Sequence, residues 1–423
     1  MMKKKHKNKY RKFPIQISIE SIKLIYIFIF PIFGVAHNKM KDKYLLLYYE
    51  YFNILIFYIS YFLSFIPLII YIIKNRKKKQ TQESTKDDNS KNSINESINE
   101  DSDLEITGNI VTNEPKDKNK RERKIYIIKI IIGFIVLCSL SLAYNHFNYE
   151  SYVEKKTIGL AYKIPEFFLL SFLILRYKYH LHHYIPLTIN TLALIAKYIL
   201  TIIQSESQDY IGKHIWLYLL FSLTFCTLLV LGKYVMDKFN QSAYLIMFVI
   251  GAVMGIILIS IAIIKYLIIS ECQIFTGFSK NVNTVETLFW FLGDVVTQFL
   301  YHLGLWITVY YFTPCHTIIS ENMMEIIYYI YDYKENKEFW LEKDYSWNFW
   351  LMPLIITINF ICSLIFNEII ILNFCNLDYY TKIRIKEREK KDSEKLNIFL
   401  DKALKDNNAN ESGASSSENS IYQ

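Results

Sequence analysis

The chain has 423 residues, of which 52% are hydrophobic and 16% aromatic, and its formal net charge is +8. A soluble protein spreads its apolar residues at helix or strand period around one or two cores, but here they come in long blocks. The composition therefore excludes an ordinary soluble globular protein. The basic residues sit in tails and connectors rather than in a compact domain, so nucleic acid is not expected as a partner.

The N-terminal part of the chain begins with a basic segment, residues 1–18, that we expect in the cytoplasm. Residues 19–73 hold two apolar blocks of the length that a spanning helix needs, Ile19–Ala36 and Tyr44–Ile73. The first block has the layout of a signal peptide, but His37 follows it where a small residue would be needed for cleavage. Residues 74–124 are rich in Lys, Asp, Asn, Ser and Glu, which predicts a disordered cytoplasmic loop.

Residues 125–377 contain eight further predicted spans, and residues 378–423 form a charged tail that is predicted to be cytoplasmic and largely disordered. The connectors alternate in charge, with the basic ones on the side of both termini. We therefore predict an all-α, polytopic transmembrane bundle of about ten spans, in contact with membrane lipids. The organelle stays open. The eight spans are Ile125–Tyr144, Thr157–Leu175, Leu181–Ile203, His214–Met236, Ala243–Ser270, Val285–Phe312, His316–Tyr331 and Trp347–Cys375.

One segment carries a family resemblance. Residues 167–178 read FFLLSFLILRYK, an apolar helix that ends in a basic tight turn and passes directly into residues 180–196. This pattern resembles the fourth and fifth helices of the nucleotide-sugar and triose-phosphate branch of the drug/metabolite transporter superfamily. Residues 305–329 resemble the eighth and ninth helices of that family. The resemblance implies two five-helix repeats with a substrate site at their interface near the membrane midplane.

The strongest group of candidate binding residues lies in the predicted span Val285–Phe312. Asp294, Gln298 and His302 stand at i, i+4 and i+8, which places them near one face of a helix. A carboxylate, an amide and an imidazole on one stripe would bind a polar ligand or relay a proton. The alternative is a set of interhelical hydrogen bonds that orient the bundle.

Three further charged residues are weaker candidates. Glu321 shares a helical face with Glu325, and together they would attract a cation; alternatively their segment lies at the interface with both acids in water. Lys163 is expected to pair with Glu166 at i, i+3. Lys197 would meet an anionic substrate or extend to the interface.

The basic turn contains three histidines, His180, His182 and His183. Two adjacent histidines cannot both point the same way on a helix, and no acid or cysteine nearby completes a site, so no metal and no other cofactor is predicted. Glu368 is expected inside the last predicted span, where it adds to a polar face.

These features favour a secondary transporter, not an enzyme, that moves a small polar or anionic metabolite by alternating access. Two alternatives remain. The first is a membrane scaffold that binds a cytoplasmic protein through residues 74–124. The second is a membrane-bound transferase acting on lipid, which would use the acids of the eighth and ninth predicted spans.

Overall fold

The computed structural model describes residues 15–17, 25–45, 49–89, 120–152, 163–204, 208–269, 272–335, 346–372, 377–381 and 384–400. Within these ranges nearly every residue is helical, which confirms the prediction of an all-α fold. The helices are α1 (Ile25–Tyr44), α2 (Glu50–Phe62), α3 (Phe65–Asn89), α4 (Lys120–Tyr152), α5 (Lys163–Ile174), α6 (Leu181–Gln204), α7 (Gln208–Phe239), α8 (Ala243–Ile269), α9 (Gln273–Asn281), α10 (Val285–Tyr311), α11 (Thr317–Glu335) and α13 (Ser346–Phe366).

Five helical stretches in the described part of the chain are long and apolar enough to cross a membrane. They are Glu50–Lys77, Glu122–Phe147, Leu219–Phe239, Ala243–Ile268 and Val285–Tyr311. Their outward side chains are apolar, as Leu267 (76% exposed) and Ile256 (66% exposed) on α8 illustrate. Such surfaces are stable against hydrocarbon rather than water. The larger number of about ten spans is not confirmed.

Several predicted spans differ from the helices that form. The described part of the predicted fourth span, Thr157–Leu175, forms α5, which has 12 residues, while residues 157–162 lie outside the described part. The predicted last span ends early, because α13 stops at Phe366 and Glu368 follows with a left-handed φ of 58°.

The segment predicted to be a disordered loop is in part helical. Helix α3 continues to Asn89 and α4 begins at Lys120, so both extend into the predicted loop, of which residues 90–119 lie outside the described part. Lys, Gln and Glu are good helix formers once an adjoining apolar helix has supplied the nucleus. Residues 384–400 of the tail are also helical, and residues 401–423 lie outside the described part.

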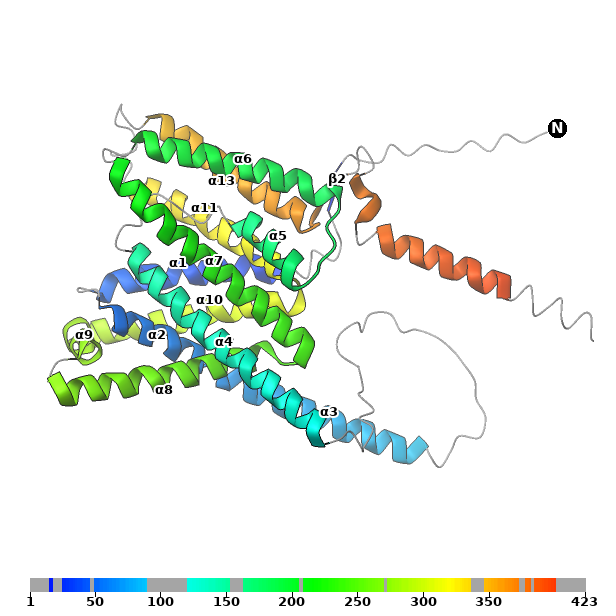
Figure 1. Ribbon diagram of the computed structural model, residues 1–423, viewed down its shortest axis with the longest axis horizontal. Coiled ribbons are helices and arrows are strands. Elements are labelled where there is room, and N and C mark those ends of the chain that lie inside the picture. The colour runs from blue at the N-terminus through cyan, green and yellow to red at the C-terminus, as the bar shows by residue number, and fades with distance from the viewer. Residues whose placement is uncertain are drawn as a thin grey trace, which may run out of the picture.

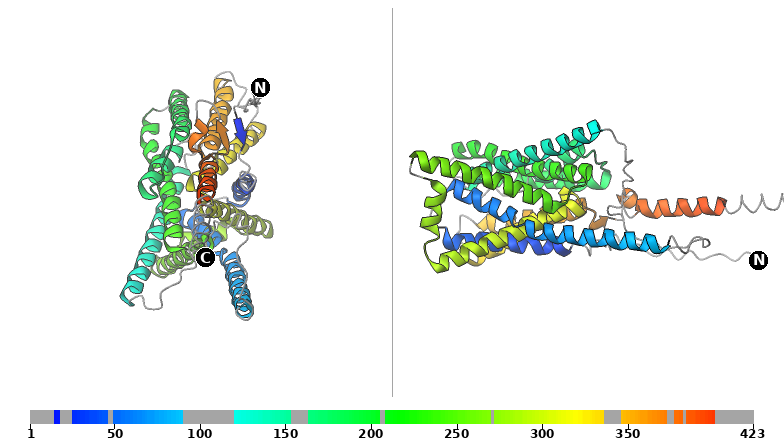
Figure 2. Two further views of the ribbon diagram at one scale, coloured as in Figure 1. Left: turned by 90° about the vertical axis from the view of Figure 1, so that its right-hand side faces the viewer. Right: turned by 90° about the horizontal axis from the view of Figure 1, so that it is seen from below.

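The long helices run side by side along the length of the molecule (Figure 1). Helix α1 packs along α10 and against α11, α4 packs on α7, α2 on α8, and α6 on α13. The short helix α9 joins α8 to α10 at one end (Figure 2). At the other end β1 (Ile15–Ile17) pairs antiparallel with β2 (Ile370–Leu372), with Ile15 opposite Leu372. The 3-10 turns are η2 (Pro314–His316) and η4 (Leu377–Tyr380).

The largest hydrophobic core lies where α2, α7, α8 and α10 meet. Trp306 of α10 is fully buried there, and its indole N–H donates to the hydroxyl of Tyr61 at 3.0 Å. Gly232 of α7 leaves the space for this ring, because a Cβ at that position would lie 2.4 Å from it. The indole N–H of this large buried side chain therefore has a hydrogen-bond partner inside the core.

We expect Gly251→Ala to destabilise the protein by roughly 1–3 kcal/mol. Helix α8 approaches α2 so closely at Gly251 that an added Cβ would lie 2.4 Å from the backbone nitrogen of Phe62. Backbone atoms inside a packed helix pair cannot move aside as a flexible side chain can. Thermal melting of the detergent-solubilised protein, followed by tryptophan fluorescence, measures the change.

Gly255 is the matched control, one turn along the same helix. A Cβ there would meet the Cβ of Tyr58 at an ordinary 4.0 Å. Because alanine is the better helix former, Gly255→Ala is expected to melt at or slightly above the temperature of the unmodified protein. Equal melting temperatures for the two variants would contradict the close approach of α2 and α8.

Candidate functional site

Close packing of α1 on α10 brings polar side chains of the two helices together. Two glycines of α10 allow the approach: a Cβ at Gly304 would lie 2.0 Å from the ring of Phe30, and one at Gly293 would lie 2.7 Å from the sulfur of Met40. The polar end of α1 is thereby held against the buried face of α10. This contact brings His37 of α1 to Asp294 of α10.

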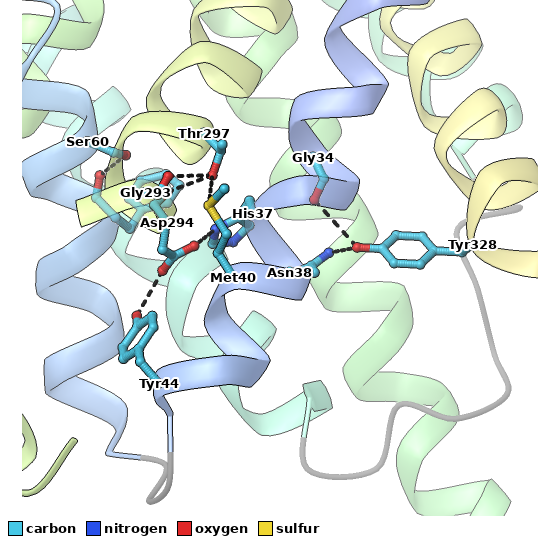
Figure 3. A network of polar contacts seen from close by, with 11 residues as sticks. Gly34, His37, Asn38, Met40, Tyr44, Ser60, Gly293, Asp294, Thr297 and Tyr328 are labelled. Atoms are coloured by element: carbon cyan, nitrogen blue, oxygen red, sulfur yellow. Dashed lines mark hydrogen bonds and ion pairs between the residues drawn. The ribbon is translucent and has the colours of Figure 1, made fainter. Parts of the chain in front are cut away.

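His37 and Asp294 form an imidazole–carboxylate pair (Figure 3). Nδ1 of His37 is hydrogen-bonded to Oδ1 of Asp294, and the hydroxyl of Tyr44 donates to Oδ2 at 2.8 Å. The side chain of Asp294 is 1% exposed, whereas that of His37 is 16% exposed. An ionised carboxylate only accepts, so the Nδ1 of His37 carries the proton and its Nε2 offers a lone pair. That tautomer is the one required of a general base.

Helix α1 is also fixed on its other side, by α11. The side-chain amide of Asn38 donates to the hydroxyl of Tyr328 (Figure 3). The ammonium of Lys39 lies 3.7 Å from the centroid of the Tyr331 ring. Near the start of α1, Ser320 donates to the carbonyl of Ile27 at 2.8 Å. His37 is therefore carried by a helix that is held from two sides.

A second group of buried polar side chains connects α5, α7 and α11. Lys163 of α5 pairs with Glu321 of α11, and its ammonium lies 4.1 Å from the ring centroid of Phe225. The predicted pair of Lys163 with Glu166 is wrong, because Glu166 instead accepts from Ser222 and from the thiol of Cys226 on α7. Glu321 is 3% exposed, so its carboxylate does not lie in water. The alternative in which this segment lies at the membrane interface is therefore wrong for Glu321.

The other residues of the predicted α10 stripe have different neighbours. Asp294, Gln298 and His302 are all buried, at 0%, 7% and 7% exposed. The ring of His302 lies among aromatic rings, with centroid distances of 4.8 Å to Phe57 and 5.1 Å to Tyr61. Oε1 of Gln298 has no hydrogen-bond partner among the described residues. Asp294 alone of the three is paired with an imidazole from another helix.

The remaining candidate is Lys197. Its backbone belongs to α6, while its side chain lies outside the described part of the structure.

Two residues of this arrangement, His37 and Tyr44, were not predicted as site residues from the sequence. His37 was considered only as a poor position for signal-peptide cleavage, and Tyr44 only as the first residue of a predicted span. Both belong to the polar end of α1, which reads HNKMKDKY from His37 to Tyr44. A cluster of polar residues that interrupts an apolar helix was the available signal, but nothing in it identifies Asp294, 257 positions from His37, as the partner.

Comparison with known families matches one segment of the chain. A family model described as OpgC protein, an acyltransferase-like family, matches residues 115–272, which include α4 to α8 and make up less than half of the chain. None of the curated proteins compared with the chain matches it. The resemblance to drug/metabolite transporters is therefore wrong, and so are the predicted transport activity and the expectation that the chain is not an enzyme. The histidine–aspartate pair lies outside the matched residues.

Proposed function

We propose that this chain is a multi-pass membrane acyltransferase in which His37 is the general base. The observation that carries the proposal is the imidazole of His37, which is oriented by a fully buried carboxylate and is itself 16% exposed. The matched family supports the reaction class, since it points to a membrane-bound succinyltransferase that modifies osmoregulated periplasmic glucans. A succinyl thioester and a sugar hydroxyl are accordingly the first donor and acceptor to test.

The reaction would use the pair as follows. Nε2 of His37 takes the proton of the acceptor hydroxyl while the hydroxyl oxygen attacks the carbonyl carbon of the thioester. The tetrahedral intermediate collapses, the carbon–sulfur bond breaks, and the thiolate takes the proton from the imidazolium. Asp294 keeps the imidazole in the required tautomer and stabilises the imidazolium that forms. Tyr44 orients that carboxylate through its hydrogen bond to Oδ2.

The charge near His37 suits an anionic donor. The polar end of α1 carries Lys39, Lys41 and Lys43 beside a single acid, Asp42. The net positive charge of this end of α1 favours the approach of an anion such as an acyl-coenzyme A. The multi-pass arrangement is supported by the five long apolar helices.

His37→Gln is the variant that tests the proposal. The purified full chain is incubated with succinyl-coenzyme A labelled in the succinyl group and with a panel of glucans and simple sugars, and label in the acceptor is measured together with the released thiol. The unmodified protein is expected to transfer label, and His37→Gln to do so at least about 100-fold more slowly, because removing a general base costs that much or more.

His146→Gln is the control for this experiment. His146 is an exposed histidine of α4 that pairs with Glu50 at 3.1 Å, and neither of these residues belongs to the His37–Asp294 pair. Its loss is therefore expected to leave the rate unchanged. Two results would count against the proposal: an unmodified protein that transfers no label to any acceptor, or a His37→Gln variant that melts normally and transfers at the full rate.

A further inference from the structure

A second cluster of ligand-type side chains lies where the start of α6 meets the chain that follows α13. Nε2 of His182 lies 2.9 Å from Oε1 of Glu368, and Nε2 of His183 lies 3.7 Å from the same oxygen. Each of the three residues offers a ligand atom within 4.8 Å of the others. The three side chains are 5%, 12% and 11% exposed, in that order for His182, His183 and Glu368. The fold therefore supplies the acid that the sequence near the histidines lacks.

The backbone at Glu368 has an unusual conformation. Glu368 adopts a φ of 58°, a conformation that costs a residue with a side chain about 1–2 kcal/mol. Neighbouring hydrogen bonds hold this turn. The side-chain amide of Asn367 donates to the carbonyl of Cys315 at 3.1 Å, and the backbone N–H of Ile369 donates to the carbonyl of Leu364 at 2.9 Å. A small cavity beside the carboxylate is lined by His182, Glu368, Leu377 and Thr381, among others.

Hydrogen bonds within the cluster leave one buried atom without a partner. When Nε2 of His182 donates to Glu368, its Nδ1 is a bare lone pair, and this buried atom has no hydrogen-bond partner among the described residues. Nδ1 of His183 accepts from the backbone N–H of His180 at 3.3 Å, so its Nε2–H also points at Glu368. One carboxylate oxygen thus faces two ring protons, while a buried acceptor is left unsatisfied, at a cost of about 1–3 kcal/mol.

We propose that His182, His183 and Glu368 bind a divalent transition-metal ion, with zinc the best match. Two imidazole nitrogens and one carboxylate oxygen are a common zinc ligand set, and a fourth position remains for water. Imidazole ligands favour zinc over magnesium or calcium. Each imidazole stays neutral on binding, because its proton moves to the other ring nitrogen. The interactions given up are the hydrogen bond from His182 to Glu368 and the long contact from His180 to His183.

Such an ion would fasten α6 to the end of α13. His182 and His183 belong to the first turn of α6, and Glu368 follows α13 in sequence. The site is independent of the proposed acyl transfer, since it shares no residue with the His37–Asp294 pair.

Zinc binding by the full chain tests the proposal. The detergent-purified protein is stripped with a chelator and titrated with zinc, and bound metal and melting temperature are measured. We expect one zinc ion per chain and a higher melting temperature. His182→Gln and Glu368→Gln should each weaken binding by roughly 100-fold or more, since even the loss of groups that only support a ligand weakens binding 10–100-fold. His146→Gln, at the exposed pair with Glu50, should bind like the unmodified protein.

Cobalt substitution distinguishes a ligand from a residue that is needed only for folding. Cobalt(II) in the site should give the visible absorption of a tetrahedral centre, and His182→Cys should add a thiolate-to-cobalt charge-transfer band. An unmodified protein that binds no zinc, or binding unchanged in both His182→Gln and Glu368→Gln, would overturn the proposal. A His182→Cys variant that binds cobalt without a thiolate band would do so as well.

Discussion

Asp294→Asn is expected to lower the rate of acyl transfer about 10⁴-fold, as the same change does to the carboxylate of a catalytic triad. The asparagine amide would donate to Nδ1 of His37, which forces the ring proton onto Nε2 and removes the lone pair that takes the substrate proton. Asparagine has nearly the shape of aspartate, and its carbonyl can still accept from Tyr44. The turnover number with labelled succinyl-coenzyme A measures the loss.

Tyr44→Phe is the companion variant for Asp294→Asn. It removes the hydrogen bond to Oδ2 but leaves the bond between Asp294 and His37, so a loss of about tenfold is expected, the equivalent of roughly 1.4 kcal/mol. A small effect of Tyr44→Phe beside a large effect of Asp294→Asn separates the tautomer from general packing. Asp294→Asn turning over at more than a tenth of the normal rate would exclude the carboxylate from this role.

Lys163→Met is expected to destabilise the protein by about 3–5 kcal/mol, because it leaves the buried carboxylate of Glu321 without its cation. Both side chains are nearly inaccessible, at 3% and 4% exposed, so water cannot replace the lost partner. The double variant Lys163→Met/Glu321→Met removes both charges and should recover most of this loss. Thermal melting of the three proteins in detergent gives the comparison.

Lys265→Met is the control for the loss of a lysine as such. Its ammonium lies 4.5 Å from the ring centroid of Tyr51 and it has an exposed side chain, so the change should alter stability by less than about 1 kcal/mol. If Lys163→Met melts like Lys265→Met, or if the double variant is no more stable than Lys163→Met, the buried pair is not what holds α5 to α11.

The α10 stripe illustrates how far periodicity reaches. Spacing of four residues placed Asp294, Gln298 and His302 on one face, and all three are buried. Their partners were not predictable in the same way. His302 lies among aromatic rings, whereas Asp294 meets His37 of α1. Periodicity describes one helix, and the neighbour that a face meets depends on how the other helices pack.

Lys163 and Glu166 show the same limit within a single turn. Their spacing permits an ion pair, yet each is bound to a different helix, because Glu321 and Ser222 come close only when α11 and α7 pack on α5. The histidines of the basic turn are a third case. They lacked an acid in the sequence around them, and the left-handed turn at Glu368 supplies one from 186 positions away.

The sequence by itself determined that the protein is helical, that several helices are apolar enough to cross a membrane, and which face of α10 is buried. These properties depend on composition and on spacing within one helix, which are local. Only the tertiary structure decided the pairs His37–Asp294, Lys163–Glu321 and His182–Glu368. Each pair joins segments far apart in the chain. Their meeting depends on how the helices pack, including close approaches such as that of α1 at Gly293 and Gly304, which no local pattern specifies.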